Sequence, residues 1–277
     1  MSVTIVAKKE FRDAVRSRLL LVLIAVFALF TLGGAVLVSQ VGELFGLGDE
    51  AGIIGVILAL QTPASVLVPL IALVVSYRSV AGERESGSAK YLLGLPHSRR
   101  DVLLGKVLGR TGVVSVAILV GFGVGIVGIV ALIGSFDPLA YLGFTLVTLL
   151  LGLVWVAIGV GCSSVTRSST RAGILGFGLL LLFWILWDVI GLALLYATDG
   201  LDRMGESIPE WYALFSSLPP GSAYGLVGSA LLPTEAGFEA AGEVSIFLSP
   251  AFGALVLLFW IVVPLGVGLL VFGRSDV

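Results

Sequence analysis

Six long apolar runs decide what this chain can fold into. Each is about 20 residues or longer, which is the length a helix needs to cross a hydrocarbon layer roughly 30 Å thick. The runs are Leu19–Val38, Ile53–Tyr77, Thr111–Phe136, Leu139–Cys162, Ala172–Thr198 and Phe247–Phe272. Within them the only charged residue is Asp188, in the fifth run. The sequence therefore predicts an all-α polytopic membrane protein with six transmembrane helices.

Composition agrees with this prediction. Of 277 residues, 58% are hydrophobic and 12% are charged, about half the charged fraction of an ordinary soluble domain. The formal net charge of −2 gives no electrostatic support for a nucleic-acid partner. No internal repeat or low-complexity stretch divides the chain, so we expect residues 1–277 to form a single membrane domain.

The charges of the connections predict the orientation. Fifteen of the 16 Lys and Arg residues lie in the N-terminal segment, the connection 78–110, the short loop with Arg167 and Arg171, or at Arg274. The other connections contain eleven acids and one basic residue, Arg203. Because Lys and Arg mark cytoplasmic loops, we expect both termini and the connection 78–110 in the cytoplasm of a plasma-membrane protein, with 198–246 outside.

The segment before the first run has an amphipathic pattern. Val3, Ala7, Phe11 and Val15 recur at four-residue steps, with basic residues on the other faces. This predicts that residues 1–18 form an interfacial helix that lies on the cytoplasmic leaflet with its apolar stripe towards the lipid. The alternative is a frayed cytoplasmic extension.

The outer segment between the fifth and sixth runs is too apolar for an ordinary loop. Its middle, Trp211–Leu232, is aromatic and apolar but is broken by Pro219, Pro220 and Gly221. Two short re-entrant helices would suit such a sequence, since irregular backbone at membrane depth is tolerated where protein covers it. A folded outer loop lying on the headgroups is the alternative.

The connection 78–110 consists of a short charged helix, a glycine break, an apolar turn and a new helix. Ser98 and Asp101 have the spacing of a capping box, which predicts that the new helix begins at Arg99 and continues into the third span. Glu83 and Glu85 form an exposed pair of carboxylates that is suited to docking a soluble partner. The alternative is a solvated charged loop.

The sequence of this connection resembles that of a known family. It reads G-E-R-E-S-G-S at 82–88, L-P-H-S-R at 95–99 and L-L-G-K at 103–106, and it is similar to the signature of membrane subunits of type-2 ATP-binding-cassette (ABC) transporters. The similarity extends to the amphipathic start, the six spans and the broken stretch before the last span. It implies a permease that forms the translocation path and is driven by a separate cytoplasmic ABC ATPase.

The same resemblance implies roles for residues and partners. In this family the connection between the second and third spans contacts the ATPase and transmits its closure. The residues that match a coupling element, including those that shape the turn behind it, are Glu83, Arg84, Glu85, Gly87, Pro96, Ser98 and Arg99. We expect two permease copies, as a homodimer or a heterodimer, in the lipid bilayer, with ATP bound on the partner ATPase and export as the direction of transport.

Within the family, the chain length and the loop sequences are most similar to those of permeases that serve nitrous-oxide-reductase maturation, which are often described as copper-related. Copper handling favours clustered Cys, Met or His ligands. Here the candidates Met1, His97, Cys162 and Met204 are scattered along the chain. The sequence therefore predicts neither a metal site nor copper transport through this subunit.

Asp188 stands close in sequence to Trp184, Trp187 and Tyr196. A charged side chain at bilayer depth costs roughly 2.5–3.5 kcal/mol and usually faces a cavity or a partner. Because Trp and Tyr favour the membrane interface, one interpretation is a hydrated residue near the outer surface. The other is a role in the pathway or in a dimer contact.

Small residues recur at helix-packing spacing along the third run and just before it. Such spacing lets helices approach closely, and it fits internal packing or a dimer interface. The glycines concerned are Gly105, Gly109, Gly121, Gly123, Gly125 and Gly128.

The motifs of enzymes are missing from the sequence. It has no G-x-x-x-x-G-K-[ST] loop, so ATP hydrolysis and any cofactor are expected on the partner, not on this chain. No second membrane acid accompanies Asp188 for an aspartyl protease, and no base accompanies the serine pairs near 163 and 168. A membrane anchor or assembly factor that transports nothing is the alternative function, and an intramembrane enzyme is a weaker one.

Overall fold

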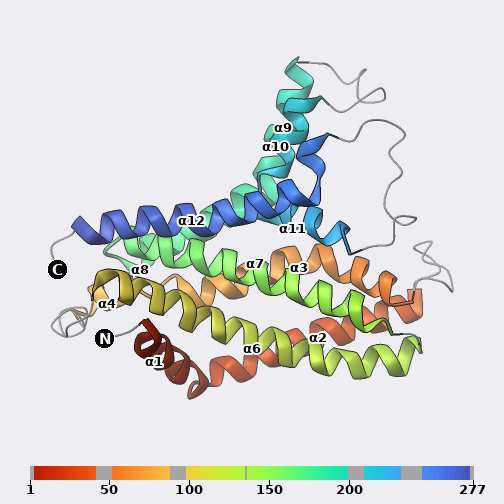
Figure 1. Cartoon of the computed structure of the whole chain (residues 1–277), viewed down its shortest axis with the longest axis horizontal. Helices are drawn as coiled ribbons and strands as arrows, with labels where there is room; N and C mark the ends of the chain where they lie inside the picture. Colours follow the sequence, from red (N-terminus) through yellow and green to blue (C-terminus); the bar gives the residue numbers. More distant parts are fainter. Residues whose placement is uncertain are drawn as a thin grey trace.

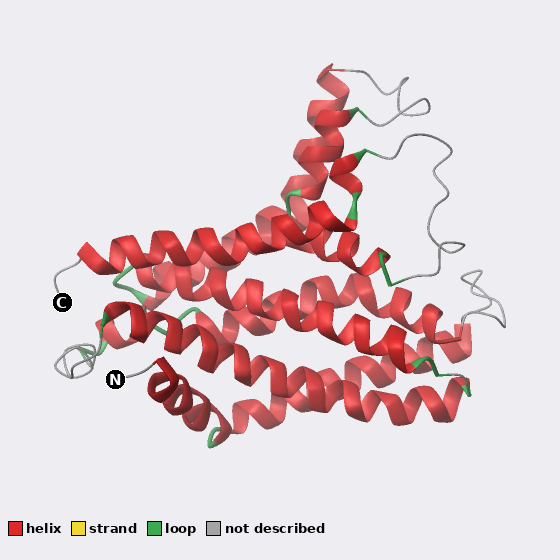
Figure 2. Ribbon diagram, in the orientation of Figure 1, coloured by secondary structure: helices red, strands yellow, loops and turns green. Residues whose placement is uncertain are grey.

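The structure contains six helical segments that are long and apolar enough to cross a membrane. It is a computed structural model that describes residues 3–41, 52–87, 98–134, 136–198, 209–231 and 245–274. The described residues contain helices and no strand, which confirms the predicted all-α membrane fold with six spans (Figures 1 and 2). The spans are α2 (Arg18–Val41), α3 (Gly52–Ser76), α6 (Arg99–Ile133), α7 (Pro138–Val165), the continuous α8–η2–α9 (Ser169–Thr198) and α12 (Pro250–Arg274).

The fourth span, α7, is the central helix of the bundle. It packs against α12, α3, α6 and α11. In its most apolar stretch of 18 residues 72% is buried, compared with 17% in the corresponding stretch of the fifth span. Leu151, Trp155 and Ile158 are almost completely buried. α7 therefore lies at the centre of the bundle, whereas α2 packs on α6 and α3 and the fifth span lies at the edge.

The start of α6 follows the predicted capping box. Asp101 N donates to Ser98 Oγ at 3.1 Å, and Ser98 N donates to a carboxylate oxygen of Asp101 at 3.4 Å. This reciprocal pair satisfies two backbone donors that a helix start leaves open. It confirms the prediction that the helix begins at Arg99.

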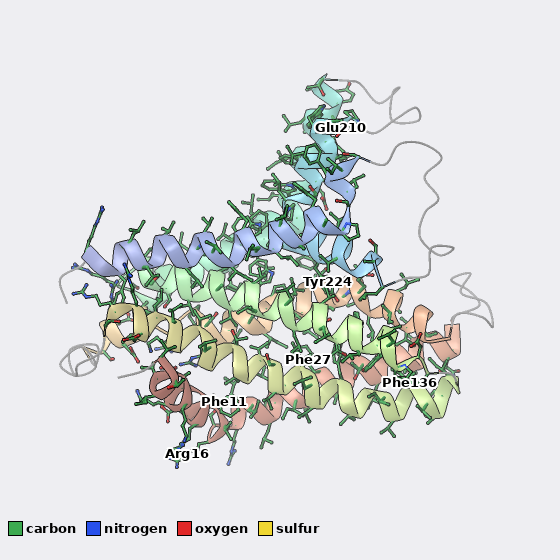
Figure 3. All side chains as sticks on the ribbon, viewed as in Figure 1. Phe11, Arg16, Phe27, Phe136, Glu210 and Tyr224 are labelled. Atoms are coloured by element: carbon green, nitrogen blue, oxygen red, sulfur yellow. The ribbon has the colours of Figure 1, made fainter. Side chains whose placement is uncertain are left out.

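Glycines of α6 let two other helices approach it closely. A Cβ atom at Gly121 would lie 2.4 Å from Cβ of Phe27 in α2, and one at Gly109 would lie 2.6 Å from Cβ of Glu10 (Figure 3 labels Phe27). Gly125 meets Thr31 in the same way, whereas Gly123 has open space. Internal packing thus accounts for these small residues, Gly123 excepted.

The N-terminal helix α1 (Val3–Val15) confirms the predicted helix. It packs on α6 through Val6, Glu10 and Ala14, the face next to the predicted apolar stripe. Glu10 lies on this packed face because it binds charge partners on α6, which a hydrophobicity pattern does not reveal. The position of α1 on the lipid stays a prediction.

The fifth span changes direction at a π-helical turn. α8 (Ser169–Leu181) continues through η2 (Leu182–Leu186) into α9 (Trp187–Thr198), and Figure 1 shows α9 and α10 (Glu210–Ser217) projecting away from the bundle. The rings of Trp187 and Phe215 stack with centroids 4.4 Å apart and join α9 to α10.

Two short helices separated at Pro219 confirm the predicted break before the last span. They are α10 and α11 (Pro220–Ser229), and η4 (Ile246–Leu248) leads into α12. α11 packs against α12 and α7, and the hydroxyls of Tyr224 and Thr148 lie 3.2 Å apart. Whether these helices dip into the lipid stays a prediction.

Candidate coupling site around α4

The short helix α4 (Ala81–Glu85) follows α3 after one turn and is fixed at its start by α7. The backbone N–H groups of Val80 and Ala81 both donate to Ser163 Oγ, each at 3.0 Å. Ser163 is fully buried, and its hydroxyl replaces the cap that α4 itself lacks. The helix ends before Gly87, whose φ of +74° is a left-handed conformation that favours glycine.

The first acidic residue of α4 points inward to a buried lysine. Lys106 Nζ, on α6, lies 2.7 Å from Oε1 of Glu83 and 2.8 Å from Oε1 of Glu10 on α1, and the Lys106 side chain is 1% exposed. Arg110 Nη2 lies 2.6 Å from the other oxygen of Glu10. Buried charges persist only where they are paired and hydrogen-bonded. This cluster therefore ties α4, α1 and α6 together.

Opposing effects act on the pKa of Glu10. Burial of the carboxyl group favours its neutral form, but the charges of Lys106 and Arg110, the hydrogen bond from Lys106 and the charge of Lys9 together outweigh it. The pKa of Glu10 is therefore lowered from its ordinary value of 4.5. Glu10 stays ionised at neutral pH and keeps both cations in place.

Arg84 joins α4 to the ends of α7 and α12. Its Nη1 donates to the carbonyl oxygens of Ser164 at 3.1 Å and Thr166 at 3.0 Å, which lie where α7 ends. Carbonyl groups in the last turn of a helix have no partner within the helix, so a guanidinium group suits them. The same group lies over the ring of Phe272 in α12, 4.7 Å from its centroid.

Glu85 and Arg99 make the remaining links. Oε2 of Glu85 accepts a hydrogen bond of 3.2 Å from the backbone N–H of Ser169, the first residue of α8. An acidic group is favoured at a helix start because the N–H groups there are unsatisfied. Arg99 donates to the carbonyl oxygen of Phe272 and lies 5.6 Å from the centroid of its ring.

Three successive side chains of α4, here called the α4 triplet, thus bind three different parts of the bundle. Glu83 binds the α6–α1 pair, Arg84 binds the ends of α7 and α12, and Glu85 binds the start of α8. Because α3 leads directly into α4, five of the six spans meet here. Side chains of α4 therefore link it to four spans, and the chain itself links it to α3.

The predicted exposed carboxylate pair is correct for Glu85 and wrong for Glu83. The Glu83 side chain is only 23% exposed because Lys106 draws it inward, whereas Glu85 and Ser86 face outward. Ser98 caps α6 and Arg99 binds the end of α12. Pro96 lies outside the described residues.

Sequence reasoning missed the partners of the triplet. In the sequence, Lys106 stands out only as part of the L-L-G-K motif, and Ser163 only as one of a pair of serines. The available signal was a lysine close to an apolar run, since such a charge requires a buried partner. Nothing in the sequence pointed to Phe272.

A cleft opens beside α4, between the ends of α3 and α8. Its volume is about 640 Å³, and polar and apolar atoms share its surface. The lining residues are Tyr77, Arg78, Glu85, Ser169, Thr170, Gly173, Ile174 and Phe177.

Asp188 lies apart from this site. It is the second residue of α9, is exposed, and borders a second cavity of about 320 Å³ between α3, α7, the fifth span and α11. The structure therefore brings Glu83, Arg84, Glu85, Ser98 and Arg99 to one end of the bundle and leaves Asp188 about midway along the spans.

Comparison with known proteins identifies the family of this architecture. A probable ABC transporter permease protein NosY of Pseudomonas aeruginosa is 32% identical over 244 residues, which cover 85% of this chain and 82% of the relative. The NosY protein of Stutzerimonas stutzeri, of the same description, is 31% identical over 97% of both chains. The ABC-2 family transporter protein model matches residues 4–277. The chain therefore belongs to the ABC-2 family and is a membrane-embedded permease subunit that works with an ABC ATPase.

Proposed function

We propose that α4 is the element through which the ABC ATPase moves the spans, and that the α4 triplet distributes this movement. The observation that supports it best is the set of three successive side chains bound to α6–α1, to α7–α12 and to α8. The helix ends are held to α4 by a buried ion pair and by hydrogen bonds to their carbonyl groups, so they move together with α4. A solvated charged loop, by contrast, would not need such partners.

The outward side of α4 is the proposed ATPase contact. Glu85 and Ser86 are exposed there, and the cleft next to them offers Arg78 and Tyr77 to an inserted side chain. Glu83 and Arg84 act behind this surface as positioning residues. The role of Glu83 is therefore transmission rather than direct contact.

The end of the bundle with α4 is the proposed cytoplasmic end in the plasma membrane. The start of α1, α4 and the end of α12 all lie there in Figure 1. So do Lys8, Arg78, Arg167 and Arg274, as the positive-inside rule requires. ATP is then hydrolysed on the partner, and this chain needs no catalytic residues or cofactor of its own.

Two permease copies, identical or different, would complete the translocation path. The fifth span supports this because most of its surface is exposed and is available to lipid or to a second copy. Export remains the expected direction of transport.

Co-purification of the permease with its ABC ATPase tests the contact. Ser86→Arg places a bulky cation on the proposed surface and should abolish recovery of the ATPase in mild detergent. Ser229→Arg is the matched control, because Ser229 is also exposed and its hydroxyl also donates to the carbonyl oxygen three residues earlier. Full recovery of the ATPase with Ser86→Arg would refute the contact.

A further inference from the structure

A polar cavity lies about midway along the spans and is separate from the α4 site. Its volume is about 320 Å³, within the range of small-molecule sites. Four elements contribute to it: α3, α7, the fifth span and α11. Its polar lining includes the hydroxyl-bearing residues Thr62, Ser65 and Ser222 and the carboxylate-bearing residue Asp188.

Asp188 forms no ion pair with another residue in the part of the chain that the structure describes. A carboxylate at such a depth is costly in hydrocarbon and usually faces a cavity or a partner. Since Asp188 borders the cavity, a cation bound there would be attracted by its carboxylate.

Trp155 presents a second unsatisfied group. Its side chain is 2% exposed, and its Nε1 is buried with no acceptor in the part of the chain that the structure describes. The indole N–H of Trp187 donates to the carbonyl oxygen of Phe215, and that of Trp260 donates to Leu218, each at 2.9 Å. An indole nitrogen is a donor only, so Trp155 lacks an acceptor that a bound solute could supply.

The backbone beside the cavity is also unusual. The π-helical turn Leu182–Leu186 places Phe183 and Trp184 on the cavity wall, and Asp188 follows it by two residues. Such turns occur mostly as single insertions in α-helices, frequently at functional sites. The aromatic side chains at this turn can also attract a cation through their ring faces.

We propose that this cavity binds a small solute that has a positively charged donor group for Asp188 and an acceptor atom for the indole N–H of Trp155. This inference rests on the proposed function in one respect, since it names the class of solute that the permease would accept. An anion could use Trp155 and the hydroxyls, but Asp188 would repel it. A neutral solute would leave the carboxylate without a cation.

Three probes of similar size separate these chemistries. Ethanolamine has an ammonium group and a hydroxyl, ethylene glycol is its neutral counterpart, and glycolate is the anion. Saturation-transfer NMR on the permease–ATPase complex in nanodiscs measures the affinity for each probe. We expect ethanolamine to bind at least tenfold more tightly than ethylene glycol, and glycolate to bind most weakly.

Variants then assign the binding to the two residues. Asp188→Asn should remove the preference for ethanolamine over ethylene glycol, and Trp155→Phe should weaken both by about threefold, as expected for one lost hydrogen bond. Glu210→Gln is the control, because this acid on α10, labelled in Figure 3, is not among the residues that line the cavity. The ratio of two probes within one variant is insensitive to the fraction of folded protein.

The outcomes separate this inference from the role of α4. Tighter binding of glycolate, an unchanged preference in Asp188→Asn, or no ethanolamine signal in a complex that hydrolyses ATP would each overturn the cation site. A wild-type complex that binds ethanolamine but whose ATPase is not coupled to the permease would instead contradict the proposed function. The expected pattern in all three variants would support the site.

Discussion

Nζ of Lys106 lies 2.7 Å from a carboxylate oxygen of Glu83, and this pair joins the short helix α4 to the third span. A second carboxylate, that of Glu10, lies 2.8 Å from the same nitrogen. One buried cation therefore holds the N-terminal helix and α4 against α6. The proposed coupling through α4 depends on this arrangement.

Removing the buried cation should destabilise the permease. Lys106→Met leaves Glu83 and Glu10 without their shared partner, and we expect a loss of about 3 kcal/mol, near the lower end for a broken buried pair, since Arg110 still binds Glu10. Thermal unfolding in detergent measures this. Lys8→Met, at an exposed position of α1, is the control and should unfold like the wild type. Equal unfolding temperatures for both variants would contradict the prediction.

Arg84 should be intolerant even of lysine. A lysine keeps the charge but lacks the planar group that binds two carbonyl oxygens and lies over Phe272. We expect Arg84→Lys to retain the ATPase while its hydrolysis rate no longer responds to transport. Measured hydrolysis in nanodiscs tests this, with Arg171→Lys, an exposed arginine of α8, as control. Normal coupling in Arg84→Lys would exclude the proposed role.

Attachment of α1 to α6 should weaken in acid. The pKa of Glu10 is lowered in the folded protein, so its stabilising contribution is complete above about pH 4.5 and is lost as the pH falls through the lowered pKa. The protection of residues 3–15 against hydrogen exchange, corrected for the intrinsic exchange rate at each pH, should fall over this range. Glu10→Gln should abolish this pH dependence, whereas Asp13→Asn, exposed on the same helix, should retain it. A protection factor that does not change with pH in the wild type would refute this.

The glycines of α6 offer a matched comparison. Gly121→Ala forces a Cβ to within 2.4 Å of Phe27 and should destabilise by about 1–3 kcal/mol through overpacking. Gly123→Ala meets open space and should stabilise slightly, because alanine is the better helix former. Thermal unfolding of the two variants under identical conditions distinguishes them. A similar loss in both would show that close helix approach is not the cause.

Local signals and hydrophobicity were sufficient to predict much of this fold. The six apolar runs correspond to six spans, and Ser98 with Asp101 set the start of α6 because a capping box acts over four residues. The break at Pro219 separates α10 from α11 for a similarly local reason. These features depend on neighbours in the sequence, so they can be identified without tertiary structure.

Contacts between distant residues were not predictable in the same way. Glu83 was expected to be exposed, yet Lys106 lies 23 residues further along the chain and Glu10 lies 73 residues before Glu83. The π-helical turn before Asp188 also has no sequence signature, since ordinary apolar residues form it. Family resemblance identified the segment that contains α4, whereas only the structure revealed its partners.

The most direct test of coupling through α4 is a distance measurement during ATP binding. Spin labels at Arg12 in α1 and Gly273 in α12 would lie at exposed positions of two elements linked to α4. The link to α1 runs through Lys106, which Glu83 and Glu10 share, and the link to α12 runs through Arg84. Cys162, the only cysteine, is first replaced by alanine. We expect a non-hydrolysable ATP analogue to shift the distance in the permease–ATPase complex but not in Glu83→Gln with the ATPase still bound. An identical shift in Glu83→Gln would contradict the account.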